Sequence, residues 1–136
     1  MNRQLHLAAF FGHRQLAKLL VESGADVNAV SHNAQKVTPL HSAVASNQTE
    51  VSQLLVDSGA DVNRKQEKDF TPLHGAAQNG NVEIARLLIR YKADVNAKLD
   101  DGRTPLALTK VEGKESGPRE ERKKVADLLH EHGAKE

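Results

Sequence analysis

Short apolar stretches alternate with polar turns along the chain at a nearly constant spacing. The stretches "LAKLLVES", "VSQLLVDS", "IARLLIRY" and "VADLLHEH" carry apolar residues three and four positions apart, as Val51, Leu54 and Leu55 do. This spacing is typical of a helix that buries one face. Gly24 and Gly59 follow the first two stretches, and glycine is favoured where a helix ends. The pattern therefore predicts four helices of about two to three turns.

A second phrase precedes each of these predicted helices. It reads Thr-Pro-Leu-His at residues 38–41 and 71–74, Thr-Pro-Leu-Ala at 104–107, and Arg-Gln-Leu-His at 3–6. A threonine side chain can cap the free N–H groups of a first turn, and proline at the next position has no N–H to leave unpaired. We therefore predict a further helix from each phrase, ending at Gly12, Asn47, Gly80 and Gly113.

The two phrases recur in phase, so the chain is a repeat. The segments "GADVNA", "GADVNR" and "KADVNA" follow the second helices with the same period. One helix pair cannot bury its own apolar face, and neighbouring pairs must therefore stack. We predict a single domain over residues 1–136, with repeats at about 1–30, 33–65, 66–98 and 99–136, a two-residue insert near 31–32 and an eight-residue insert within 113–124. The longer insert is expected to be a solvated loop or an early start of the last helix, with a partner-contacting flap as the alternative.

This pattern resembles the ankyrin repeat, whose signature has a period of 33 residues and a Thr-Pro-Leu-His box. The resemblance extends over about residues 4–134. It implies an all-α solenoid of stacked helix-turn-helix units with projecting β-turn loops. It also implies that His6, His41 and His74 hydrogen-bond to backbone and to the threonine of the box. Equivalent histidines in stacked units lie about 8–10 Å apart, too far to share a metal ion, so we expect no metal site.

Composition narrows the functions that this chain could have. Basic and acidic residues number 19 and 18, which gives no general attraction to nucleic acid or an acidic membrane. The chain has no cysteine, no apolar run long enough to span a membrane and no secretory signal pattern. A phosphate-binding glycine loop, a nucleophile elbow and a zinc-helix motif are also absent. We expect a cytoplasmic protein, with the nucleus left open, that is not an enzyme and has no cofactor.

The resemblance implies a module that binds a partner protein through the turn tips and the exposed faces of the first helices. Carrying these positions over gives Phe10, Phe11, Val37, Ala45, Ser46, Lys68, Phe70, Gln78, Asn79, Asp101, Arg103 and Val111. All three phenylalanines of the chain fall in this set, and aromatic residues are favoured anchors at interfaces. Alternatively, Phe10 and Phe11 cap the first repeat and Phe70 packs against the neighbouring turns. The protein partner is unidentified, and the chain is expected to be a monomer.

Three other roles remain open for this sequence. Basic turn residues such as Lys65 and Lys68 could recognise an anionic ligand, a nucleotide or phosphate, although the mixed charges around them favour a protein. The chain could also be a purely structural scaffold segment of a larger protein. Finally, Asn28, Asn63 and Asn96 resemble the targets of an asparaginyl hydroxylase, although asparagine at such a turn also stabilises it through bonds to backbone.

Overall fold

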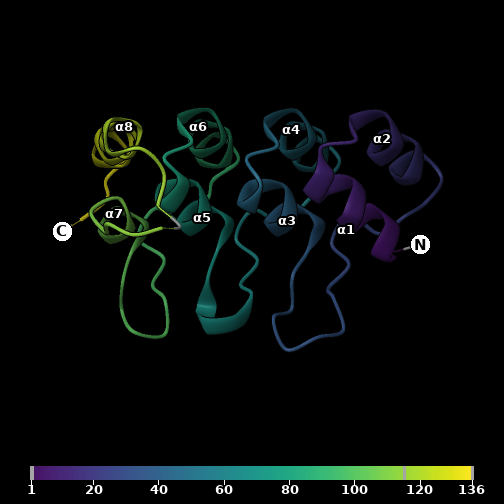
Figure 1. Ribbon diagram of the computed structural model, residues 1–136, viewed down its shortest axis with the longest axis horizontal. Coiled ribbons are helices and arrows are strands. Elements are labelled where there is room, and N and C mark those ends of the chain that lie inside the picture. The colour runs from purple at the N-terminus through teal and green to yellow at the C-terminus, as the bar shows by residue number, and fades with distance from the viewer. Residues whose placement is uncertain (1, 115, 136) are drawn as a thin grey trace.

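The computed structural model describes residues 2–114 and 116–135 as a row of helix pairs (Figure 1). The helices are α1 (Asn2–Phe11), α2 (Arg14–Glu22), α3 (Pro39–Ala45), α4 (Thr49–Asp57), α5 (Pro72–Asn79), α6 (Val82–Arg90), α7 (Pro105–Leu108) and α8 (Arg119–Glu131). A short 3-10 helix, η1 (Glu67–Asp69), lies between α4 and α5. No strand occurs in these two ranges. The all-helical solenoid expected from the sequence is confirmed.

The helices form two parallel rows. Figure 1 shows α1, α3, α5 and α7 in one row and α2, α4, α6 and α8 in the other. Neighbours within each row are in contact, α1 with α3 and α2 with α4 at one end, and α5 with α7 and α6 with α8 at the other. Three long loops project to one side of the first row: finger 1 (residues 23–38), finger 2 (58–71) and finger 3 (91–104).

The predicted threonine caps start the helices of the first row. The Thr38 side chain accepts a hydrogen bond from the backbone N–H of His41, and Thr71 accepts the equivalent bond from His74. Thr104 accepts from the N–H of Ala107. In each case proline occupies the start of the helix, as expected. These starts are encoded locally because cap and capped group lie three residues apart.

The ends of the first-row helices follow the prediction in three repeats and depart from it in the fourth. Gly12, Asn47 and Gly80 have φ values of +73°, +60° and +70°, and the helices before them stop there. The fourth helix was expected to reach Gly113, but α7 ends at Leu108. This expectation was wrong because the backbone beyond Leu108 hydrogen-bonds to a side chain of α8, as described below.

The core lies between the two rows. It is made of leucine, isoleucine, valine and alanine side chains that recur at equivalent places in successive pairs, such as Leu5, Leu40, Leu73 and Leu106, each at most 1 % exposed. Small residues at Ala8, Ala43 and Ala76 are buried in the same way and allow the first-row helices to approach closely. None of the described helices combines the length and apolar character needed to cross a membrane.

Candidate functional site

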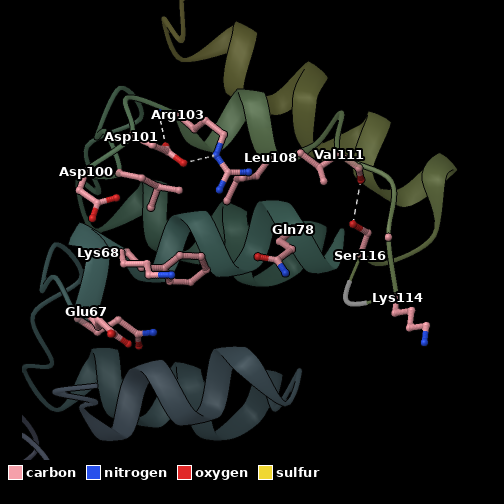
Figure 2. A pocket seen from close by; sticks show the side chains of 14 residues that line it. Glu67, Lys68, Gln78, Asp100, Asp101, Arg103, Leu108, Val111, Lys114 and Ser116 are labelled. Carbon is pink, nitrogen blue, oxygen red and sulfur yellow. Dashed lines mark hydrogen bonds and ion pairs between the residues drawn. The ribbon is translucent and has the colours of Figure 1, made fainter. Parts of the chain in front are cut away.

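A groove runs between fingers 2 and 3 and the helices behind them (Figure 2). It has a volume of about 710 Å³. We call it the finger groove; its lining residues are Gln66, Glu67, Lys68, Phe70, Gln78, Leu99, Asp100, Asp101, Arg103, Leu108, Val111, Gly113, Lys114 and Ser116. Half of the predicted binding set lies here: Lys68, Phe70, Gln78, Asp101, Arg103 and Val111. Figure 2 shows Gln78 near the middle of the groove, Lys68 and Asp101 on the side of the fingers, and Val111 and Ser116 of the α7–α8 loop on the opposite side.

Backbone hydrogen bonds hold the fingers in shape. The Gln66 N–H donates to the Phe70 carbonyl at 2.9 Å, and the Leu99 N–H donates to the Arg103 carbonyl at 2.8 Å. Neighbouring fingers are also joined, because the Asp100 N–H donates to the Lys68 carbonyl at 3.0 Å. One wall of the groove is therefore a continuous hydrogen-bonded edge rather than separate loops.

The box histidines fasten each finger to the helix beside it. His74 Nε2 donates to the Arg103 carbonyl at 3.1 Å, while its Nδ1 accepts from the Thr71 N–H at 3.2 Å. His41 does the same with the Arg64 carbonyl at 2.8 Å and the Thr38 N–H at 3.2 Å. The structural role that the resemblance implied for these histidines is confirmed.

Burial keeps these histidines neutral. Desolvation lowers the pKa of His41 to about 4 and lowers the pKa of His74 in the same direction. Protonation would also place a second N–H at Nδ1, facing the N–H of the capping threonine. In the part of the chain that the structure describes, no group of three or more His, Asp or Glu side chains is spaced to hold a metal ion.

The three phenylalanines do not form one surface. The Phe70 ring is half-buried, lies 5.6 Å from the His74 ring and borders the finger groove. Phe10 and Phe11 lie on α1, at the other end of the stack, where their rings meet edge to face at 5.1 Å. The two residues are 47 % and 61 % exposed. Phe70 thus packs against His74 and also lines the finger groove, while Phe10 and Phe11 lie on a different surface, on α1.

The remaining predicted residues lie outside the finger groove. Val37 borders a separate hollow of about 600 Å³ beside finger 1, with Arg3 and Ser42. The Ser46 hydroxyl donates to the Phe10 carbonyl at 2.7 Å. The Asn79 amide donates to the carbonyls of Val44 at 3.1 Å and Ala45 at 3.4 Å. Ser46 and Asn79 therefore use their polar atoms to join neighbouring first-row helices, and Ala45 is exposed between them.

Charges of both signs surround the finger groove. The Arg103 Nε donates to Asp101 Oδ2 at 2.9 Å. The backbone N–H of Arg103, and also its guanidinium, lower the pKa of the Asp101 carboxyl. Lys68 and Lys114 lie on the same lining as Glu67 and Asp100. A rim that carries both positive and negative charges, around apolar side chains inside the groove, suits a binding partner whose surface also carries charges of both signs.

Two models of known protein families match the chain. One, described as ankyrin repeats in three copies, matches residues 2–66, and another, described as ankyrin repeats in many copies, matches residues 54–108. The chain belongs to the ankyrin-repeat family. A search of the curated proteins found no match to it. Ankyrin repeats are generally protein–protein interaction modules and are typically non-catalytic.

Arg122 is a residue of this ankyrin stack that the sequence did not single out. The residue is only 2 % exposed. The guanidinium donates to the carbonyls of Thr109, Val111 and Gly117, each at 2.8 Å, and pairs with Glu112 at 3.0 Å. The charged run "REERKK" gave no sign that one of its arginines is buried.

The same contacts fix the conformation of the eight-residue insert. The carbonyls that follow α7 bond to Arg122 instead of continuing the helix. In addition, the Gly117 N–H donates to the Gln78 carbonyl of α5 at 2.8 Å. The loop is therefore docked onto the neighbouring repeat. The last helix begins at Arg119 and has 13 residues, against 9 in α6, as the early-start reading expected. Val111 and Ser116 of this loop form a wall of the finger groove.

The asparagines of the "DVN" turns link consecutive ankyrin repeats. Each side-chain oxygen accepts a backbone N–H of the next repeat: Asn28 from Asp61 and Asn63 from Asp94 at 2.7 Å, and Asn96 from Lys135 at 3.0 Å. Each amide group donates to a carbonyl of that repeat as well. Hydroxylation of these residues stays a prediction.

Proposed function

We propose that this ankyrin-repeat chain is a non-catalytic module that binds a partner protein through its fingers and first-row helices, with the finger groove as the main contact. The observation that carries the proposal is the gathering of half the predicted set in one groove. Among these residues, Phe70 and Val111 offer apolar contact, and Gln78 offers an amide. A groove of this kind suits an apolar partner side chain with polar neighbours.

A protein fits this surface better than an anionic ligand does. The Arg103 guanidinium is already engaged by Asp101, and the carboxylates of Glu67 and Asp100 lie on the same rim. A phosphate group would meet these negative charges, whereas phosphate sites gather positive ones. A monomeric state and a cytoplasmic location belong to the proposal, and light scattering and imaging of the tagged chain test them.

Site-specific photocrosslinking tests this proposal directly. A photoreactive phenylalanine analogue is introduced at Gln78 or Val111 in the groove, or at the exposed Arg90 of α6 as the matched control. The partner is then captured in native extract. We expect adducts from the two groove positions and none from Arg90. Adducts from Arg90 alone would move the interface to the second-row helices and overturn the proposal.

A charge-changing variant provides the second test. Gln78→Arg/Val111→Glu alters the groove without removing a side-chain hydrogen bond between described residues or a buried apolar group, so the fold should persist by circular dichroism. We expect it to lose at least about 90 % of the captured partner. The control Arg86→Glu/Arg90→Glu, on the exposed side of α6, should retain it. Equal capture by both variants would show that the groove is not the interface.

A further inference from the structure

Gln78 brings a carboxamide to the middle of the finger groove, where the protein itself does not use it. Figure 2 shows this side chain between the finger side and the loop side of the groove. The residue is half-buried, and no other described residue hydrogen-bonds to its carboxamide; the bond with Gly117 uses the backbone carbonyl. The other first-row helices have Phe10, Ala45 and Val111 in the same place. A partly desolvated amide of this kind favours a ligand that supplies its hydrogen bonds.

A carboxamide matches the backbone of an extended peptide. It has N–H donors and an acceptor oxygen side by side, and a residue of an extended chain presents a free C=O and a free N–H in the same way. The backbone groups of a partner helix are already paired within that helix. The unused carboxamide of Gln78 therefore favours a partner segment that crosses the groove in an extended conformation.

Apolar side chains line the groove on both sides of Gln78. Phe70 and Leu99 come from fingers 2 and 3, and Leu108 and Val111 come from α7 and the loop after it. Leu99 and Leu108 are largely buried, so Phe70 and Val111 offer most of the apolar contact. Side chains of an extended segment alternate between its two faces. An apolar residue in the middle of the segment therefore reaches this lining while the backbone stays beside the carboxamide.

The finger end of the groove is net negative. The carboxylates of Glu67 and Asp100 take part in no ion pair with another described residue, and the Lys68 ammonium is also unpaired among them. Asp101 and Arg103 neutralise each other at 2.9 Å. Two unpaired carboxylates thus stand against one unpaired ammonium. Because the Asp100 N–H bonds to the carbonyl of Lys68, the residue after Glu67, the two carboxylates belong to directly linked parts of neighbouring fingers.

The loop end of the groove carries the opposite charge. Among the lining residues of the α7–α8 loop, Lys114 is the charged one, and it forms no ion pair with another described residue. The carboxylate of Glu112 in the same loop is held by two arginines at 3.0 Å. Figure 2 shows Lys114 at the opposite end of the groove from Glu67 and Asp100. A partner segment therefore meets unpaired charges of opposite sign at its two ends.

We propose that the finger groove takes an extended segment of the partner protein in a fixed orientation. The backbone of the segment bonds to the Gln78 carboxamide, and an apolar side chain in its middle packs against Val111 and the other apolar lining residues. A basic side chain lies at the finger end, beside Glu67 and Asp100, and an acidic side chain lies beside Lys114. This orientation rests on the proposed function, which makes the groove the main contact with the partner.

The test uses the full chain, labelled with ¹⁵N, and a short synthetic peptide with lysine near one end, leucine in the middle and glutamate near the other end. Prolines flank these residues to prevent a helix. A nitroxide label at the lysine end should broaden the amide resonances of residues 66–70 and 99–103, and a label at the glutamate end those of residues 111–114. Peptides with lysine at both ends or glutamate at both ends should bind at least about fivefold more weakly, because one end is repelled.

Methylation of the central peptide nitrogens, one at a time, tests the bond to Gln78. One of these changes removes the N–H that the carboxamide accepts, and it should weaken binding about fivefold. Gln78→Met keeps a side chain of similar length and should weaken the unmethylated peptide to a similar extent, but the methylated peptide no further. If methylation costs the same affinity in both chains, Gln78 does not bind the backbone and the proposed contact is wrong.

A charge exchange makes the outcome independent of folding losses. Glu67→Lys/Asp100→Lys/Lys114→Glu reverses the sign of both ends of the groove. The bound peptide should then turn end for end, so that each nitroxide label broadens the residues that the other label broadened before. A damaged fold cannot produce this reversal. Arg86→Glu/Arg90→Glu, on the exposed side of α6, should bind the peptide as the original chain does.

Three results would overturn the oriented segment: a peptide that fails to bind, one that binds without a preferred orientation, or one that keeps its orientation in the charge-exchanged chain. The photocrosslinking experiment decides the groove separately. Groove adducts with the native partner would then show that the groove is the interface and that only the extended, oriented segment has failed. Adducts from Arg90 alone would show that the proposed function has failed as well.

Discussion

Lys92 has a backbone conformation that is energetically unfavourable for a residue with a side chain and that glycine adopts easily. Its φ is +71°, and the equivalent residues Gly24, Gly59 and Gly133 have φ values of +97°, +100° and +92°. The sequence comparison between repeats anticipated this conformation. We expect Lys92→Gly to raise the free energy of unfolding by about 1 kcal/mol, because glycine adopts positive φ without the steric cost. Urea denaturation measures the change.

Two control variants separate backbone strain from loss of the lysine side chain. Lys92→Ala removes the charge but keeps a Cβ, so it should not reproduce the gain. Gly59→Ala should be destabilising, although nothing lies within 4 Å of the added methyl group, because its φ alone is unfavourable for alanine. A Lys92→Gly protein with an unchanged or lower melting temperature would contradict the assignment.

His41 makes stability depend on pH. Its pKa is about 4 in the folded chain, through burial, and about 6.5 when unfolded. Below pH 6.5 the unfolded chain binds the extra proton, so stability falls as the pH approaches 4. We expect His41 to contribute a loss of about 2 kcal/mol between pH 7 and pH 5, and His74 acts in the same direction. Urea titrations across this range measure the change.

A variant pair isolates this effect from other titrating groups. His41→Gln should be less stable at pH 7 but should lose less stability on acidification. His32→Gln, at an exposed position of finger 1, should keep the pH dependence of the original chain. If the free energy of unfolding depended on pH in the same way for the original chain and for His41→Gln, burial of His41 would not be the cause of the loss of stability in acid.

Among the elements, the α7–α8 loop depends on one glycine. A methyl group on Gly117 would lie 1.8 Å from the backbone oxygen of Asn79, which cannot move without disturbing α5. We therefore expect Gly117→Ala to break the hydrogen bond to Gln78 and to cost about 1–3 kcal/mol of stability. Thermal unfolding measures the loss, and exchange of the backbone amides of residues 109–114, 116 and 117 should rise.

Gly113 provides the matched control in the same loop. Nothing lies within 4 Å of a methyl group added there, and its φ is outside the left-handed region. Gly113→Ala should therefore change stability by no more than about 0.5 kcal/mol. Equal effects of the two substitutions would show that docking of this loop against α5 is not what Gly117 provides.

Helix starts were predictable from the sequence, and one helix end was not. Thr38, Thr71 and Thr104 cap the groups three residues ahead, so a short stretch contains the whole interaction. The end of α7 depends on Arg122, which binds the Thr109 carbonyl from 13 positions along the chain. A helix end set by a distant side chain leaves no mark in the local pattern of the helix.

At the scale of the whole molecule, asparagine bridges link each helix pair to the next. Asn63 joins the second pair to the third through the Asp94 N–H and the Lys92 carbonyl, at 2.7 and 3.2 Å. Repeat proteins unfold cooperatively only while such neighbour contacts couple their units. We expect Asn63→Ala to cost about 1–3 kcal/mol and to let the two halves of the stack open separately. Hydrogen exchange of the helix amides measures both.

Asn33 is the control for this prediction. Among the described residues its side chain bonds only to Ser31 and Gln35 of its own finger, so Asn33→Ala should leave the exchange of the helices unchanged. If Asn63→Ala lowers protection evenly across α1 to α8, the stack still opens as one unit. That result would contradict the role of Asn63 as a coupling point.

The sequence by itself determined the repeat, the helix pairs and the threonine caps of α3, α5 and α7, because each follows from residues that are close in sequence or that recur with the period. The bonds of the box histidines were implied only by the resemblance to the ankyrin repeat, since their carbonyl partners lie 23 and 29 positions away. The sequence also pointed to the groove residues Lys68, Phe70 and Arg103.

Only the tertiary structure decided which residues share a surface. It placed Val111 in the finger groove, where the buried Arg122 binds its carbonyl, and it placed Phe10 and Phe11 at the other end of the stack, on α1. The groove depends on packing between repeats, because Asp100 bonds to Lys68 and Gly117 bonds to Gln78, and neither pair leaves a signal in the local sequence.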